Sequence, residues 1–276
     1  MTQAPVVPEY PPPRHVLRDL GLTVEHRPDR TSQAWLTVEP HLTTPSGVPR
    51  AGIVATLVDV LGGGLAGLTA RPSWIATADL TLHLLGRPVD GALSAHGRVL
   101  RAGRTTVVID VALTGESGAR AGTATMSFAV LPRREGNPVL DQVDTVQRMV
   151  MDGGVPFDGP ALERIGIRTV DAAGGVVELP YHDYVRNSLG AIQGGMMATV
   201  AEIAAQEALG AACGAEVDVV DLQITYLALA KVGPVRSRAR VLAATPDFGV
   251  AHVELFDRGA DERLTTLVRA VAVRRP

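Results

Sequence analysis

The sequence has few cysteines, few aromatic residues and no strong excess of either charge. Its single cysteine, Cys213, excludes an internal disulfide framework and a cysteine-based zinc cluster. Aromatic residues make up 4% of the chain, which argues weakly against a pocket rich in stacked rings. The net charge of −3 gives no bulk attraction to nucleic acid or to an anionic membrane. The seven histidines show no metal-ligand spacing, so no metal site is predicted.

Targeting and membrane signals are also missing. The first 14 residues carry five prolines but lack the basic start and apolar run of a signal peptide. The least polar long stretch, residues 52–70, contains Asp59 and several glycines, which favours a buried helix over a membrane span. We therefore expect a cytoplasmic protein, in agreement with its low cysteine content.

An internal repeat is the most informative feature that is present. Residues 52–59 (GIVATLVD) and 195–202 (GMMATVAE) share a glycine, an Ala-Thr pair and an acid at one offset (195 − 52 = 143). Three further blocks match in the same order at offsets of 142 to 145: residues 20–22 with 165–167, 79–82 with 221–224, and 98–100 with 240–242. The repeat predicts two domains, residues 15–134 and 157–276, joined by a connection in which residues 141–151 form a short bridging helix.

Each half has the pattern of one helix followed by strands. Apolar residues nearly all round predict buried helices at 52–61 and 195–209. Period-two alternation predicts strands at residues 80–84, 105–113, 121–131, 222–226, 235–241, 249–256 and 264–273. A parallel sheet would need a helix between successive strands, and the sequence leaves no room for one. The predicted fold class is α+β, with an antiparallel sheet wrapped around a central helix in each half.

This arrangement resembles the hot-dog fold, and its motif is similar to that of phenylacetate-pathway acyl-CoA thioesterases. Those proteins commonly have Asn, then His-Gly-Gly six residues later, then an acid eight residues past the first glycine of the motif. The second half matches this spacing with Asn187, Gln193-Gly194-Gly195 and Glu202. The first half matches it with Thr44, Arg50-Ala51-Gly52 and Asp59. Gln193 replaces the usual histidine, and Arg50 and Ala51 depart further from the pattern.

The resemblance implies two fused hot-dog domains that form an intrachain pseudo-dimer and hydrolyse an acyl thioester. A helix start offers unpaired N–H groups for an oxyanion, and a carboxylate can act as general base or as nucleophile. Glu202 lies eight residues past Gly194, roughly 12 Å along the helix at about 1.5 Å per residue. The acid of each site must therefore come from the other half, so we expect the two central helices to lie antiparallel.

Two composite sites follow from this expectation. Site A combines Asn187, Gln193 and the N–H of Gly194 with Asp59, and Gly195 lets the substrate approach. Site B combines Thr44, Arg50 and the N–H of Ala51 with Glu202, and Gln206 stands one turn further on. Site A has the better cradle and is favoured as the active one. Site B has the longer acid, whereas the position beside Asp59 that corresponds to Gln206 is Gly63.

Structural explanations of these residues remain open. Asn187 can cap the segment that leads into the helix, Gly194 and Gly195 can serve close packing, and the two acids can form buried salt bridges to arginine.

The functional alternatives are a non-catalytic acyl-thioester binder or regulator, a hot-dog dehydratase or hydratase, and a scaffold. The dehydratase is disfavoured because neither motif has the histidine which that chemistry normally uses. As an acyl-CoA thioesterase the protein would act on an acyl-CoA or acyl-carrier-protein thioester, with coenzyme A only as part of the substrate and no cofactor. We expect no nucleic-acid or membrane partner and a homo-oligomer of the fused pseudo-dimer.

Overall fold

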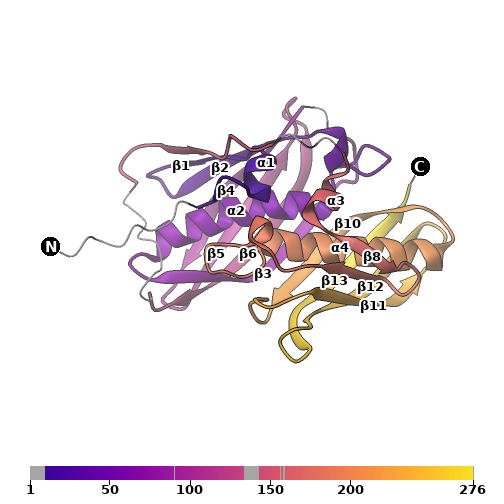
Figure 1. The fold of residues 1–276 in the computed structure, drawn as a ribbon. Coiled ribbons are helices and arrows are strands. Elements are labelled where there is room, and N and C mark those ends of the chain that lie inside the picture. The colour runs from indigo at the N-terminus through magenta and orange to yellow at the C-terminus, as the bar shows by residue number, and fades with distance from the viewer. Residues whose placement is uncertain (1–9, 90, 134–142, 156, 158, 276) are drawn as a thin grey trace.

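Two long helices lie side by side at the centre of the molecule, and each is backed by strands (Figure 1). The structure is a computed structural model that describes residues 10–89, 91–133, 143–155, 157 and 159–275. Helix α2 spans Ala51–Ala70 and helix α4 spans Gly194–Cys213. The predicted ends at residues 134 and 276 lie outside the described residues. The domain boundaries therefore stay a prediction.

Every predicted strand is present, and the structure adds strands that were not predicted, among them residues 92–102 of the first half. The first half contains α1 (Val16–Asp19), β1 (Thr23–His26), β2 (Thr31–Thr37), η1 (Pro40–Leu42), α2, β3 (Trp74–Leu84), β4 (Ala92–Ala102), β5 (Thr106–Thr114) and β6 (Arg120–Leu131). After β7 (Gln147–Val150), the second half contains α3 (Ala161–Ile165), β8 (Arg168–Asp171), β9 (Val176–Leu179), η2 (Asp183–Val185), α4, β10 (Val217–Tyr226), β11 (Val235–Ala244), β12 (Phe248–Asp257) and β13 (Arg263–Arg274). The predicted α+β class is confirmed.

One antiparallel sheet runs through both halves. Its strand order is β7-β1-β2-β4-β5-β6-β3-β10-β13-β12-β11-β9-β8, so the halves meet where β3 pairs with β10. Thr81 pairs there with Gln223, and these two residues are equivalent in the repeat (223 − 81 = 142). The two halves are therefore related by a local pseudo-twofold axis at this pair.

The two central helices are buried and cross closely in opposite directions. A Cβ atom on Gly52 would collide with the backbone of Thr199, and one on Gly195 would collide with the backbone of Thr56. Glycine at both positions is what lets the two backbones approach. The start of each helix therefore lies beside the middle of the other, as the reach of the acids predicted. Helix α2 is long and apolar enough to cross a membrane, but 78% of its apolar window is buried in the protein, as in a core helix.

The structure corrects two expectations. Both helices are longer than predicted, and α2 continues past residue 61 through Gly62, Gly63 and Gly64. A side chain on Gly62 would collide with Met126 and one on Gly64 with His26, so glycine at these two positions gives the strands room. The predicted bridging helix at 141–151 is wrong in its described part. Gln147–Val150 forms strand β7, which pairs with β1 of the first half, whereas residues 141 and 142 lie outside the described residues.

Candidate active site

Site A is an acid placed against the start of the opposite helix. The half-buried Asp59 projects from α2, and its Oδ1 accepts a hydrogen bond of 3.0 Å from Thr77 Oγ1. Its Oδ2 lies 2.8 Å from the point where a side chain on Gly194 would begin. Burial raises the pKa of Asp59 to about 6, with the Thr77 hydrogen bond acting in the opposite direction. At neutral pH this carboxylate is ionised and close to the pKa that suits a general base.

The start of α4 leaves backbone donors free beside this acid. Gln193 is the N-cap residue and makes no side-chain cap. In the part of the chain that the structure describes, neither Gly194 nor Gly195 has an acceptor for its N–H. The Gln193 side chain is buried, and its Oε1 has no hydrogen-bond partner among the described residues. Site A therefore combines a basic carboxylate with unused N–H groups at the positive end of a helix dipole.

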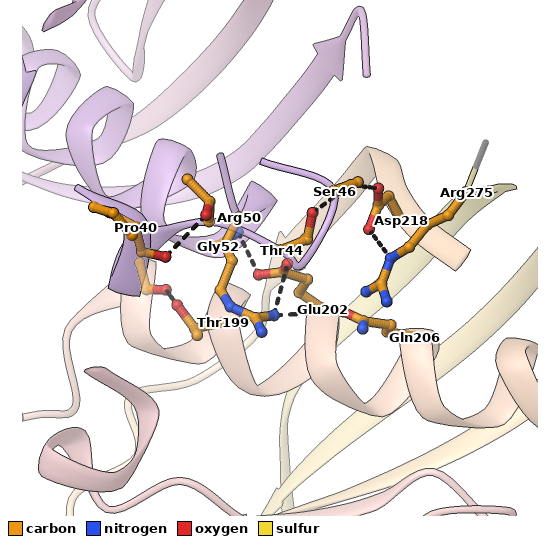
Figure 2. A network of polar contacts seen from close by, with 12 residues as sticks. Pro40, Thr44, Ser46, Arg50, Gly52, Thr199, Glu202, Gln206, Asp218 and Arg275 are labelled. Atoms are coloured by element: carbon orange, nitrogen blue, oxygen red, sulfur yellow. Dashed lines mark hydrogen bonds and ion pairs between the residues drawn. The ribbon is translucent and has the colours of Figure 1, made fainter. Parts of the chain in front are cut away.

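Site B contains the same parts in a closed arrangement. Glu202 is fully buried, and its Oε2 accepts the N–H of Gly52 at 2.8 Å (Figure 2). Its Oε1 lies 3.7 Å from Nη1 of Arg50, which also donates to Oε1 of Gln206 at 3.4 Å. Burial raises the pKa of Glu202, while Arg50 and the N–H groups of Gly52 and Ala51 lower it. The carboxylate thus occupies the helix start that a substrate oxyanion would need.

Thr44, also assigned to site B by its motif position, has contacts of a different kind. Its Oγ1 is 2.8 Å from Oγ of Ser46, and Ser46 donates in turn to Asp218. Asp218 also accepts a 2.7 Å hydrogen bond from Nε of Arg275 (Figure 2). Among the described residues, no hydrogen bond joins Thr44 to Glu202. Thr44 therefore contributes to a polar link between the two halves.

Asn187, assigned to site A, has its amide oxygen engaged in the loop before α4. Its Oδ1 accepts the backbone N–H groups of Leu189 at 2.9 Å and Ala191 at 3.1 Å. These are turn contacts of the kind that asparagine favours. They lie in the loop before α4 and do not cap the helix itself, whose N-cap residue is Gln193.

Three residues that sequence reasoning missed also belong to the surroundings of Asp59. Thr77 binds the carboxylate, and Tyr226 donates through its hydroxyl to the carbonyl oxygen of Gly194 at 3.0 Å. Burial first, and the charge of Asp59 second, raise the pKa values of Tyr10 and Tyr226. The repeat could have pointed to Thr77 and Tyr226, because Val219 and Leu84 stand at the corresponding positions of the other half. Among the described residues, no three or more His, Cys, Asp or Glu side chains are grouped so that they could hold a metal ion.

Comparison with known proteins gives a family match in the second half and a shared fold. Residues 189–263 match the family model of the thioesterase superfamily. No curated protein matches the sequence. A 12:0-ACP thioesterase from Umbellularia californica aligns over 89% of this chain and 95% of its own, with a TM-score of 0.60 at 10% identity. An acyl-ACP thioesterase from Bacteroides thetaiotaomicron aligns over 88% of this chain and 98% of its own, with a TM-score of 0.58 at 12% identity.

A third solved structure has a similar fold. The tesB protein of Mycobacterium avium subsp. paratuberculosis aligns over 88% of this chain and 93% of its own, with a TM-score of 0.58 at 16% identity. At such identities these structures establish the fold alone, and the family match covers residues 189–263 only. The chain therefore has the fold of these proteins, two fused hot-dog domains, and a segment in its second half that is similar to the thioesterase superfamily.

Proposed function

We propose that the protein hydrolyses an acyl-CoA or acyl-carrier-protein thioester at site A, with Asp59 as the reacting carboxylate. One observation carries this proposal. Asp59, whose pKa is raised to about 6, lies beside the free N–H groups at the start of α4. The three solved structures are named for thioesterase or tesB proteins, which supports this class of substrate.

In the general-base route, Asp59 takes a proton from a water molecule, and the hydroxide attacks the thioester carbonyl carbon. The carbonyl oxygen becomes an oxyanion that the N–H groups of Gly194 and Gly195 stabilise. Collapse of this intermediate breaks the C–S bond, and the departing thiolate takes the proton from Asp59. The products are a carboxylic acid and a free thiol, and the reaction consumes only water. No separate cofactor is needed, and coenzyme A takes part only as the substrate's thiol.

Asp59 can instead attack the carbonyl carbon directly and form a mixed anhydride that water then opens. If water opens the anhydride at the Asp59 carbonyl carbon, single turnover in ¹⁸O-labelled water places label in the Asp59 carboxylate. The general-base route, like opening of the anhydride at the acyl carbon, places label only in the product acid.

We further propose that site B does not turn over substrate. Its acid is held by the Gly52 N–H and faces the guanidinium of Arg50, so it is neither free to act as a base nor clear of the helix start. The first half nevertheless supports the mechanism at site A. It shows that a helix start of this repeat binds a carboxylate, and the equivalent donors in the second half are unoccupied by protein in the described chain.

Release of free thiol from a panel of acyl-CoAs of increasing chain length, with an acyl-carrier-protein thioester beside them, tests the proposed function. We expect steady-state turnover of at least one member of this panel. Tight binding of acyl-CoA without any thiol release would contradict hydrolysis and favour the non-catalytic binder.

The rate should depend on pH through Asp59. Because burial raises the pKa of Asp59 to about 6, we expect kcat/KM to fall tenfold per pH unit below that value and to level off above pH 7. A profile measured from pH 4.5 to 8.5 with a neutral acyl group checks this. A rate that stays constant down to pH 4.5 would exclude Asp59 as the base.

Gly194→Ala should inactivate site A without unfolding the protein. The new Cβ would lie 2.8 Å from Oδ2 of Asp59, so the flexible carboxylate must move away from its present position. A misplacement of about 1 Å can cost roughly 10²-fold in rate, so we expect a fall in kcat of about that size. The matched control is Ala51→Gly at the equivalent position of the first half, which should keep wild-type kcat. Equal effects of the two substitutions would contradict the assignment of catalysis to site A.

A further inference from the structure

Tyr226 is the last residue of β10, and its side chain contacts Gly194, the first residue of α4. Its hydroxyl donates a 3.0 Å hydrogen bond to the carbonyl oxygen of Gly194 and lies 3.3 Å from the point where a Gly194 side chain would begin. Oδ2 of Asp59 lies 2.8 Å from that same point. The phenol and the carboxylate therefore both lie next to the vacant side-chain position of Gly194, on the side of the helix start where site A lies.

The hydrogen bond acts on the peptide unit that supplies an oxyanion donor. The carbonyl of Gly194 and the N–H of Gly195 belong to one planar trans peptide and point in opposite directions. A phenol that fixes the carbonyl therefore also fixes the direction of the N–H. A donor on the carbonyl also polarises the peptide, which makes the N–H a stronger donor to an anion.

The first half lacks this device. By the offset of 142, the residue equivalent to Tyr226 is Leu84, which has no hydroxyl. Their partners on the neighbouring strand also differ: Tyr226 pairs with Thr266, whereas Leu84 pairs with Gly122. The start of α2, whose N–H groups hold Glu202, thus has no tyrosine at this position, while the start of α4 has one.

We propose that Tyr226 is a positioning residue of site A that aims the Gly195 N–H at the thioester oxygen through the Gly194 carbonyl. The inference rests on the proposed function, because it assigns Tyr226 to the oxyanion pocket of that reaction. Tyr226 acts through the peptide and need not touch the substrate. Its effect should therefore appear in the transition state, where charge develops on the oxygen, and hardly in the ground state.

Tyr226→Phe tests this role because it keeps the ring and removes the hydroxyl. Loss of a direct oxyanion donor typically costs 10²–10³ in kcat, and an indirect one should cost less, about tenfold. We expect KM to stay within about twofold, since ground-state binding does not use the hydroxyl. The matched control is Tyr181→Phe, which removes a 2.8 Å hydrogen bond from a tyrosine hydroxyl to the carbonyl of Gly190, a residue of the loop before α4 and not of the helix itself. This control should keep wild-type kcat.

Two inhibitors separate positioning from packing. A trifluoromethyl ketone analogue of a turned-over acyl-CoA adds water or the Asp59 carboxylate at its carbonyl carbon, which gives a tetrahedral adduct with an oxygen at the oxyanion position. A thioether analogue keeps the ground-state shape. In Tyr226→Phe the affinity for the ketone should fall about tenfold, in parallel with kcat, while the affinity for the thioether stays unchanged. Equal loss of both affinities, or a kcat within twofold of wild type, would overturn the inference while wild-type turnover upholds the proposed function. Failure of the wild type to hydrolyse any thioester would instead overturn both.

Discussion

Asp59→Asn should lower kcat by roughly 10²–10⁴, the range that a positioned general base contributes. The amide keeps the size of the side chain and can still accept the Thr77 hydrogen bond, but it cannot take a proton from water. Substrate affinity should change little, because the acid acts on the attacking water. Steady-state thiol release, with protein concentration fixed by absorbance, measures the loss.

The same substitution should make the protein more stable. The pKa of Asp59 is about 6 in the folded protein and near 3.8 when unfolded, so folding favours the protonated form. The wild type therefore loses stability as pH rises from about 4 to about 6, and the loss persists above that range. A neutral amide at this position carries no such cost. We expect Asp59→Asn to gain roughly 1–3 kcal/mol in unfolding free energy at pH 8 and nothing near pH 4. Urea titrations at the two pH values check this.

Asp79→Asn is a suitable control for both effects. Asp79 is an exposed acid on β3 that accepts hydrogen bonds from Ser127 and Thr225, both at 2.9 Å, outside the two sites. Its substitution should leave kcat within about twofold of wild type. Full activity in Asp59→Asn together with inactivity in Glu202→Gln would reverse the assignment and place the reaction at site B.

Arg50→Met should destabilise the protein by about 3–5 kcal/mol at pH 8, because it leaves the buried Glu202 without a compensating charge. The methionine keeps much of the apolar volume, so packing contributes little to this loss. Burial already raises the pKa of Glu202, and removing Arg50 raises it further. The carboxyl group will then take up a proton as pH falls, and the destabilisation should shrink between pH 8 and pH 5.

The double variant Arg50→Met, Glu202→Gln separates charge from packing. Removal of both partners leaves no unpaired charge, so most of the lost stability should return. Arg98→Met is the matched surface control, since Arg98 pairs with Asp110 at 3.0 Å with 67% of its side chain exposed and should cost at most about 1 kcal/mol. A change below 1 kcal/mol in Arg50→Met at pH 8 would show that Glu202 is not held in its charged form.

The duplication and the antiparallel helices could be predicted because they depend on spacing. Each half has a glycine followed by an acid at the same spacing. The acid lies too far along its helix to reach the start of that helix, so the two helices must lie antiparallel for each acid to reach the start of the other. Strands β3, β5, β6 and β10 to β13 followed from their alternation, whereas no expectation was set for β4, β8 and β9. Strands β1 and β2 are short, and no expectation was set for them. Strand β7 lies in a segment with no repeat partner, which removed the signal that located the others.

The state of each site could not be predicted, because it depends on distances between the halves. Glutamate is one methylene longer than aspartate, and in this structure Glu202 reaches the N–H of Gly52 while Asp59 bonds to Thr77. A sequence shows both acids at equivalent positions but not which one touches the opposite backbone. Tyr226 was visible only as an alternating strand residue. Its contact with Gly194 depends on how closely β10 packs against the helix start.

Because β3 pairs with β10 of the same chain, the two halves can change independently in evolution. In a dimer of identical subunits, any substitution appears in both symmetry-related pockets, so neither can change alone. Here a single codon alters one pocket only. Arginine at 50 opposite glutamine at 193, and leucine at 84 opposite tyrosine at 226, are differences that identical subunits could not maintain. Fusion thus allows one pocket to become part of the scaffold while the other retains the groups for chemistry.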